Sequence, residues 1–421
     1  MSNPHMIHFH ALAAVVLFVA ASSGAQTIAT GDSRSVSQPS FPSVCDTLTA
    51  KFTTSQRSSP PSSDDTSRVQ AALTACAGTG KSVVLASSGS DNAFYTGLLT
   101  VNGEGLVINS GVTLEGSNSY TSQSELILVE GSNSFIGGPG TIDGRGDIVS
   151  GTPRLVQTKS TTNFIMYDVN LNQARHPSLY MEGGSGATVW GVTFRTPATR
   201  TNADGIDIDS IANVTVNDCS VEAGYDGIAV KTNSGAASNI TVENSQFYGT
   251  HGLSIGSQTF KGVTNVLFKN NYVYGKDLSG NTSGSNNGAR VKSDSTCGGL
   301  TKQVSYINTC LYNVEHLIIV DAHYGSCSGT SGTPQFEDIL VNGMTSASSL
   351  SGSSTFYGYN GSNLAQVYVA NTNLDTSKQS SDEYATVYLD NTSEAPSGTD
   401  VTTHSFSISG SAPTCSFNTS D

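Results

Sequence analysis

Short stretches in which apolar and polar residues alternate recur along most of the chain, and turns rich in Gly, Asn and Ser separate them. These stretches occupy residues 106–116, 126–131, 163–171, 187–194, 213–221, 239–247, 265–273, 303–313, 338–345 and 366–374. Alternation over a few residues is typical of β-strands that bury one face. The pattern therefore predicts an all-β fold built from many short strands.

The spacing of these stretches indicates a structural repeat. Asn213, Asn239 and Asn265 begin three successive stretches and lie 26 residues apart each time, and Asn163 and Ala187 fall close to the same interval. A repeat of this length fits one coil of a parallel β-helix, in which neighbouring coils lie about 4.8 Å apart. A propeller blade needs about 40 to 45 residues and does not fit. We expect a right-handed parallel β-helix that forms one domain over residues 26–421.

Two segments depart from the strand pattern. Residues 64–76 place Val69, Ala72 and Leu73 at helical spacing after Asp and Ser start signals, which predicts a short helix capping the first coil. Residues 11–21 form an apolar run followed by small residues, which predicts a signal peptide over 1–25, cleaved near Ala25, and a secreted protein. The run is too short to span a bilayer, which takes about 20 apolar residues.

Composition and charge narrow the class of function. The chain has 44 glycines and only 12% charged residues, as expected for short strands joined by many turns. Its formal net charge of −14 argues against binding to nucleic acid or to an anionic membrane surface. No Cys and His cluster has the spacing of a zinc site, and nothing in the sequence calls for a cofactor. We expect a monomer.

The cysteines and sequons fit a secreted protein. Seven cysteines in an oxidising compartment leave at least one without a partner. The sequence favours two local pairs, Cys45 with Cys76 and Cys310 with Cys327. Six sequons permit glycosylation in a eukaryotic host. They lie at Asn213, Asn239, Asn281, Asn360, Asn391 and Asn418.

Polar residues of types that can take part in catalysis or binding recur at the interval of one coil. Asp204, Asp226 and His251 are separated by 22 and then 25 positions, so in a β-helix they should stack on successive coils. Further candidates follow near the same strand ends on later coils: Arg290, Lys292 and Tyr324. The sequence therefore predicts a column of polar residues on one long face of the solenoid.

Four short motifs at these positions resemble those of the polygalacturonase family, the pectin-cleaving glycoside hydrolases. In chain order they are Asn202-Ala203-Asp204, Gly224-Tyr225-Asp226, Thr250-His251-Gly252 and Arg290-Val291-Lys292. They match the family's Asn-Thr-Asp, Gly-Asp-Asp, Gly-His-Gly and Arg-Ile-Lys motifs, and GPGTIDGRG at 138–146 extends the similarity over most of the mature chain. The resemblance implies inverting hydrolysis of the α-1,4 bonds between galacturonates, with pectic polysaccharide as the partner.

The resemblance also implies a role for each site residue. An inverting site needs a carboxylic acid to protonate the leaving oxygen and a carboxylate to activate water, about 6.5 to 9.5 Å apart. The family assigns the water to the carboxylates matching Asp204 and Asp226, and His251 helps to orient them. The position of the family's general acid is Tyr225. Substrate contacts are assigned to Asn202, Asp207, Lys231, Arg290, Lys292, Tyr324, Arg175 and His176.

Arginine binds a carboxylate bidentately and lysine adds a compact charge, so Arg290 and Lys292 suit an acidic sugar. Tyr225 departs from the family pattern at a position where general acid catalysis contributes about 10² to 10⁴ in rate. A phenol with a pKa near 10 can donate a proton, although it is a weaker acid than a carboxyl. Alternatively, Asp226 takes the acid role while Asp204 or Asp207 holds the water. Relatives that cut rhamnogalacturonan also carry a substitution in the aspartate pair of the Gly-Asp-Asp motif, so rhamnogalacturonan remains an alternative substrate.

Two other classes of function fit part of the sequence. One is a weakened homologue that binds pectic oligomers or a plant inhibitor protein without cutting, and Tyr225 favours it. The other is a polysaccharide lyase on the same solenoid, which needs a calcium site and an arginine base. Turnover on polygalacturonate distinguishes the first from a hydrolase, and chelator sensitivity with unsaturated products identifies the second.

Overall fold

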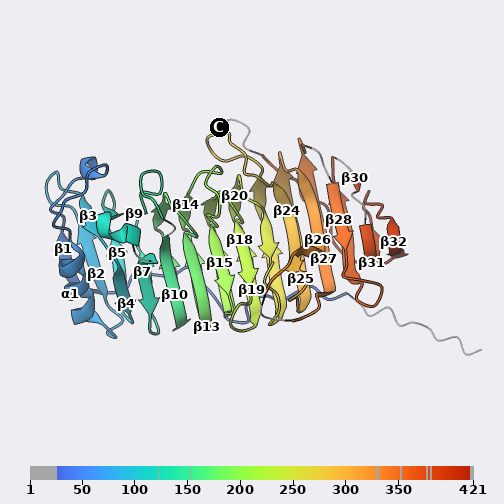
Figure 1. Ribbon diagram of the computed structural model, residues 1–421, viewed down its shortest axis with the longest axis horizontal. Helices are drawn as coiled ribbons and strands as arrows, with labels where there is room; N and C mark the ends of the chain where they lie inside the picture. Colours follow the sequence, from blue (N-terminus) through green and yellow to red (C-terminus); the bar gives the residue numbers. More distant parts are fainter. Residues whose placement is uncertain are drawn as a thin grey trace, which may run out of the picture.

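The computed structural model describes residues 26–122, 124–151, 153–328, 331–350, 353–375, 378–379 and 382–417. The predicted signal peptide and the sequon at Asn418 lie outside these residues. Over the described part, the chain winds into a long stack of coils, with strands of successive coils side by side (Figure 1). The architecture is a right-handed parallel β-helix, as the strand pattern and its period predict.

The strands of each coil contribute to three parallel faces that follow the long axis of the stack. The first sheet consists of β4 (Leu99–Asn102), β7 (Glu125–Glu130), β10 (Arg154–Thr162), β13 (Leu179–Trp190), β15 (Ile206–Asp209), β18 (Ile228–Lys231), β21 (Leu253–Ile255), β24 (Asn287–Asp294), β26 (His316–Gly325), β28 (Ser353–Tyr357) and β30 (Lys378–Gln379). The second sheet consists of β1 (Val44–Thr49), β2 (Ser82–Ala86), β5 (Gly105–Ile108), β8 (Phe135–Gly137), β11 (Ile165–Tyr167), β16 (Ala212–Asn217), β19 (Ala237–Glu243), β22 (Val263–Lys269), β25 (Leu300–Tyr312), β27 (Gln335–Ala347), β29 (Ala365–Asn373), β31 (Asp382–Asp390) and β32 (Gly398–Ser405).

The third sheet consists of β3 (Ala93–Thr96), β6 (Thr113–Gly116), β9 (Thr141–Asp143), β12 (Asn170–Asn172), β14 (Thr193–Arg195), β17 (Ser220–Glu222), β20 (Gln246–Tyr248) and β23 (Tyr272–Tyr274). Long strands turn the corners between these faces. The first half of β13 pairs with β15 and its second half with β16, and β25 pairs with both β22 and β23. The three faces are therefore one continuous sheet wound around a common interior.

One α-helix lies over the first coils. α1 spans Thr66–Cys76, which confirms the predicted helix over 64–76, and it buries Val69 and Leu73 in the main apolar core. Two short 3-10 helices, η1 (Thr54–Gln56) and η2 (Asn118–Ser122), accompany it. Within the described residues, the structure contains no helix long and apolar enough to cross a membrane.

The interior of the stack is an apolar core that runs through successive coils. On the first sheet, strand register stacks one buried apolar residue per coil, in the order Leu179, Ile206, Ile228, Leu253 and Ala289. Successive side chains of a strand point to opposite faces, so the next position points outward. That outward row is Tyr180, Asp207, Ala229, Ser254 and Arg290. Register alone therefore gathers polar residues from separate coils on one outer face.

An asparagine ladder accounts for the 26-residue interval. The side-chain amide of Asn239 donates to Oδ1 of Asn213 at 3.2 Å, and that of Asn265 donates to Oδ1 of Asn239 at 2.8 Å. All three residues have positive φ, between 56° and 57°, a left-handed conformation that Asn adopts more readily than most residues. The ladder repeats the same corner on each coil.

The structure holds three disulfides among the described residues: Cys45–Cys76, Cys297–Cys327 and Cys310–Cys415. The first pair confirms the prediction, whereas the predicted pair of Cys310 with Cys327 is wrong. Those two cysteines are only 17 positions apart, less than one coil, so they lie at different points around the solenoid. Cys327 instead bonds a residue 30 positions away, about one coil back. Cys219 is free and buried, which confirms an unpaired cysteine.

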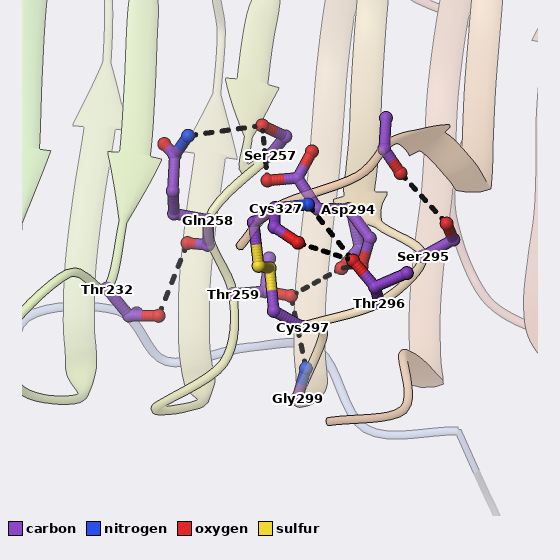
Figure 2. The surroundings of a disulfide bond; sticks show 12 residues. Thr232, Ser257, Gln258, Thr259, Asp294, Ser295, Thr296, Cys297, Gly299 and Cys327 are labelled. Carbon is purple, nitrogen blue, oxygen red and sulfur yellow. Dashed lines mark hydrogen bonds between the residues drawn. A yellow bond between two sulfur atoms is a disulfide. The ribbon is translucent and has the colours of Figure 1, made fainter. Parts of the chain in front are cut away.

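The Cys297–Cys327 disulfide joins the loop after β24 to the loop after β26 (Figure 2). Beside it, Oγ1 of Thr296 accepts the N–H of Cys327 at 3.0 Å and donates to the carbonyl of Cys327 at 3.1 Å. Oγ of Ser257, at the end of the preceding strand, donates to Asp294 at 3.2 Å. The C-terminal ends of neighbouring strands of the first sheet are thereby held together.

Candidate active site

Asp204, Asp226 and His251 occupy equivalent positions on three successive coils. Each lies two residues before the start of its strand: Ile206 of β15, Ile228 of β18 and Leu253 of β21, which pair with one another in the ladder. The main-chain N–H of Asp226 donates to Oδ1 of Asp204 at 2.9 Å, which locks two neighbouring coils together. The structure therefore brings these three residues into the predicted column. Arg290 lies in the outward row instead, and its side chain reaches back to Asp226.

Asp226 is a buried carboxylate held by cations. Its Oδ2 accepts a hydrogen bond from Nζ of Lys292 at 2.8 Å, and its Oδ1 accepts one from Oγ of Ser254 at 2.6 Å and lies 3.5 Å from Nη1 of Arg290. Burial alone would raise the pKa of Asp226, but the charges of Lys292 and Arg290 outweigh burial and hold its pKa below the ordinary value. Asp226 is therefore ionised in mildly acidic solution. This argues against the alternative in which it donates a proton.

One coil earlier, two carboxyls share a single ammonium group. Nζ of Lys231 donates to Oδ2 of Asp207 at 2.9 Å and to Oδ2 of Asp204 at 3.2 Å. Oδ1 of Asp207 is buried without a hydrogen-bond partner. Burial, followed by the negative charge of Asp204, raises the pKa of Asp207 well above its ordinary value despite the opposing charge of Lys231. The raised pKa favours the protonated form of Asp207.

Tyr225 borders both of these groups. Its ring packs against the imidazole of His251 at an interplanar angle of 43°, with 4.3 Å between the ring centroids, and Nζ of Lys292 lies 5.8 Å from its centroid. Burial raises the pKa of Tyr225 above that of a free phenol, and the hydroxyl contact with Tyr324 and the charge of Asp226 raise it further. Tyr225 is thus a poorer proton donor here than in water.

His251 is neutral in this setting. Burial lowers its pKa to about 4, because the attraction of Asp226 is offset by the nearby charges of Arg290 and Lys292. A neutral imidazole adds no charge to the carboxylates around it. Its visible role is to pack against the Tyr225 ring.

Arg290 and Lys292 also lie over an exposed aromatic ring. The guanidinium carbon of Arg290 is 4.9 Å from the Tyr324 ring centroid, and Nζ of Lys292 is 4.8 Å from it. Tyr324 is 39% exposed, so solvent reaches this place. Two cations beside an open aromatic surface can bind an acidic sugar, with the carboxylate on the cations and the pyranose ring on the tyrosine.

A cavity of about 310 Å³ opens on the other side of Tyr225. Six predicted site residues line it: His176, Asn202, Asp204, Asp207, Tyr225 and Lys231. Burial, followed by the charge of Arg154, lowers the pKa of His176. Arg175 does not line this cavity, and its Nε donates to the carbonyl of Gly151 at 3.1 Å.

The sequence pattern missed several residues that contribute to the site. Ser254 bonds Asp226, and the cavity is also lined by Arg154, Tyr180, Asn233 and Gln258. Ser254 and Tyr180 belong to the outward row with Asp207 and Arg290, so a register assigned from the sequence would have found them. Arg154 opens β10, two coils before β15, and no motif marks it.

Comparison with known proteins places the chain in a family. Residues 76–395 match glycosyl hydrolases family 28. An endo-polygalacturonase of Pectobacterium parmentieri is 34% identical over 357 residues, covering 75% of this chain and 83% of that protein. A polygalacturonase of Ralstonia solanacearum is 30% identical, covering 77% and 76%. The solved polygalacturonase of Erwinia carotovora ssp. carotovora superposes with a TM-score of 0.72 at 31% identity, covering 85% of this chain and 99% of that one. The chain therefore belongs to family 28 of the glycosyl hydrolases.

Proposed function

We propose that this chain hydrolyses the α-1,4 bonds between galacturonosyl residues of polygalacturonate, with inversion at the anomeric carbon. The observation that carries the proposal is the environment of Asp226, an ionised buried carboxylate fixed by Lys292 and Ser254. It lies one coil from a second carboxylate, that of Asp204.

The charges on the two sides of Tyr225 differ in sign. Asp226 with Arg290 and Lys292 sums to one positive charge, which suits a substrate carboxylate next to the bond that is cut. On the other side, Asp204 and Asp207 share only Lys231 and sum to one negative charge when both are ionised. Excess negative charge favours a bound proton.

This asymmetry assigns the two catalytic roles. Asp226 is the base: it takes a proton from water as the water oxygen attacks the anomeric carbon. The Asp204 and Asp207 pair is the acid: the proton held by Asp207 passes through Asp204 to the glycosidic oxygen as its bond to carbon breaks. One water is added across one glycosidic bond, and afterwards Asp226 releases its proton to solvent while the Asp204 and Asp207 pair regains one.

Tyr225 borders both the acid and the base in this scheme. Its raised pKa disfavours it as the proton donor, and its packing on His251 keeps the ring in place. Because Asp226 has a lowered pKa and Asp207 a raised one, the family's missing carboxyl at this position does not leave the site without an acid. Two carboxyls whose environments shift their pKa values in opposite directions are typical of an acid and base pair.

We also propose that the protein is a single-domain, monomeric enzyme that works outside the cell. Support comes from the apolar leader of the sequence and from three disulfides among the described residues, which form in oxidising compartments. Pectic polysaccharide is then the partner that the enzyme meets.

The test is a reducing-end assay of the native chain on polygalacturonate and on rhamnogalacturonan at mildly acidic pH. We expect new reducing ends from polygalacturonate, no ultraviolet-absorbing unsaturated products, and a loss of about 10² or more in rate for Asp226→Asn. Lys269→Gln, which changes an exposed residue on the second sheet, is the control and should retain full activity. Turnover that appears only in Tyr225→Asp would instead identify a weakened binding protein.

A further inference from the structure

Arg154 is a cation at the cavity that has no carboxylate partner. It lines the cavity together with Asp204 and Lys231. Among the described residues it forms no ion pair within 4.0 Å, and its charge acts only at longer range on Glu125, its register neighbour on the preceding coil, where it lowers the carboxyl pKa against the effect of burial. Its Nε is buried without a hydrogen-bond partner. A guanidinium in this state is ready to receive an anionic ligand.

The guanidinium is also held in a fixed position. Its carbon lies 4.3 Å from the ring centroid of Tyr180, and Nη1 donates to Oε1 of Gln157 at 3.1 Å. Both supports are themselves anchored. The Tyr180 hydroxyl donates to Asp209 at 2.6 Å, and the Gln157 amide donates to Glu182 at 2.9 Å. This preorganisation lowers the entropy cost of binding a ligand on Arg154.

The carboxyls of the cavity do not neutralise Arg154, because Lys231 already bonds both Asp204 and Asp207. The charge of Arg154 is felt in the cavity, where it lowers the pKa of His176. A ligand that enters here therefore meets a guanidinium without an ion-pair partner at one wall and carboxyls paired with Lys231 at the other. The complementary ligand group is a single carboxylate.

The position of Arg154 matches a polymer that repeats carboxylates. Arg154 lies on β10 and Arg290 on β24, five ladder steps apart through β13, β15, β18 and β21. At about 4.8 Å per step, the two strands are separated by about 24 Å along the stack. The reacting carboxyls lie between them.

We propose that Arg154 forms a second carboxylate subsite, which takes the free carboxylate of a uronosyl residue and discriminates against its methyl ester. The subsite rests on the proposed polyuronate substrate. It deepens that proposal by specifying that a sugar bound far from Arg290 is unesterified. A methyl ester removes the negative charge and cannot accept the bidentate pair of hydrogen bonds that arginine gives to a carboxylate.

Binding tests the subsite without any need for turnover. The Asp226→Asn chain serves as the background, and calorimetry compares an unesterified hexagalacturonide with its fully methyl-esterified form. Adding Arg154→Gln should weaken binding of the unesterified oligomer by about 10-fold or more and that of the ester by less than about 3-fold. Lys269→Gln, with the same change in net charge, should affect neither by more than about 2-fold.

Arg154→Lys keeps the charge and loses the bidentate donor geometry of the guanidinium. We therefore expect its affinity for the unesterified oligomer to lie between that of Arg154→Gln and that of the chain with Arg154. It also guards against misfolding of the glutamine variant. Equal loss for both oligomers, no loss for either, or no binding of either by the Asp226→Asn chain would overturn the subsite. A native chain without turnover would contradict the proposed function and leave this comparison valid.

Discussion

The imidazole of His251 packs against the ring of Tyr225 at a tilt of 43°, with 4.3 Å between their centroids. Tyr225 also lines the cavity that holds Asp204 and Asp207, so its ring borders both that pair and the Lys292 side chain that bonds Asp226. The residue that departs from the family pattern thus shapes the site between two carboxyl groups in unlike environments.

Replacing the phenol tests whether Tyr225 is the proton donor. Since its raised pKa makes it a poor acid, we expect Tyr225→Phe to keep kcat on polygalacturonate within about 3-fold of the native value, with a modest rise in KM from the lost contact with Tyr324. Steady-state kinetics on both chains measures this. A fall of about 10² to 10⁴ in kcat would show that the phenol itself donates the proton.

Lys231 should set the alkaline limb of activity. The acid form of Asp207 is present below its raised pKa, so kcat/KM falls as the pH rises through that pKa. The charge of Lys231 lowers the pKa of Asp207, and removing that charge must raise it. We therefore expect the alkaline limb of Lys231→Gln to move to higher pH by roughly one unit, with a lower maximum.

The matched control for this profile is Lys269→Gln, which should leave both limbs in place. An alkaline limb that stays fixed in Lys231→Gln, or that moves to lower pH, would exclude the Asp204 and Asp207 pair as the acid.

Glu115 should make folding stability depend on pH. Its side chain is buried near Arg57 at 3.8 Å, and burial, with the charge of Asp143, raises its pKa to about 7. A carboxyl with a raised folded-state pKa stabilises fully below its unfolded pKa and loses that contribution as pH rises through about 7. Between pH 4.5 and 7.5 the loss should reach roughly 2 kcal/mol.

Glu115→Gln should remove this part of the pH dependence. Urea unfolding at both ends of the range gives the comparison, and Glu337→Gln, at an exposed carboxylate paired with Lys302, serves as the control. Identical pH dependence in the native chain and Glu115→Gln would contradict the buried-carboxyl explanation.

The disulfide between Cys297 and Cys327 should stabilise the coils that carry Arg290 and Tyr324. It closes a loop with a sequence separation of 30 residues, for which chain entropy gives about 3.6 kcal/mol. We expect the double variant Cys297→Ser with Cys327→Ser to lower the free energy of unfolding in urea by about that amount. A loss below about 1 kcal/mol would show that the surrounding hydrogen bonds alone hold these loops.

The sequence predicts the fold well because most contacts in a solenoid join residues about one coil apart in the sequence. The 26-residue interval of Asn213, Asn239 and Asn265 corresponds to a ladder of side-chain amides between adjacent coils, so periodicity alone identified the coil. Disulfide partners were harder. The bond of Cys310 to Cys415 brings the C-terminal segment across 105 residues to the outside of the stack, and no periodicity marks such a return.

The site could be predicted where residues share a position on the coil, as Asp204 and Asp226 do. Its electrostatics could not, because they depend on how side chains from different coils divide the available cations. Lys231 turns toward Asp204 and Asp207 while Lys292 turns toward Asp226. Burial and the charge of Asp204 raise the pKa of Asp207, whereas Lys292 and Arg290 hold that of Asp226 low, and sequence spacing carries no trace of either effect.

The most direct measurement is proton nuclear magnetic resonance of the first sugar released when the native chain acts on polygalacturonate. Inverting hydrolysis of an α-linked polymer by Asp226 as base predicts that the β-anomer of the new reducing end appears first and only later equilibrates with the α-anomer. Initial release of the α-anomer, or the absence of any new reducing end, would contradict inverting hydrolysis at this site.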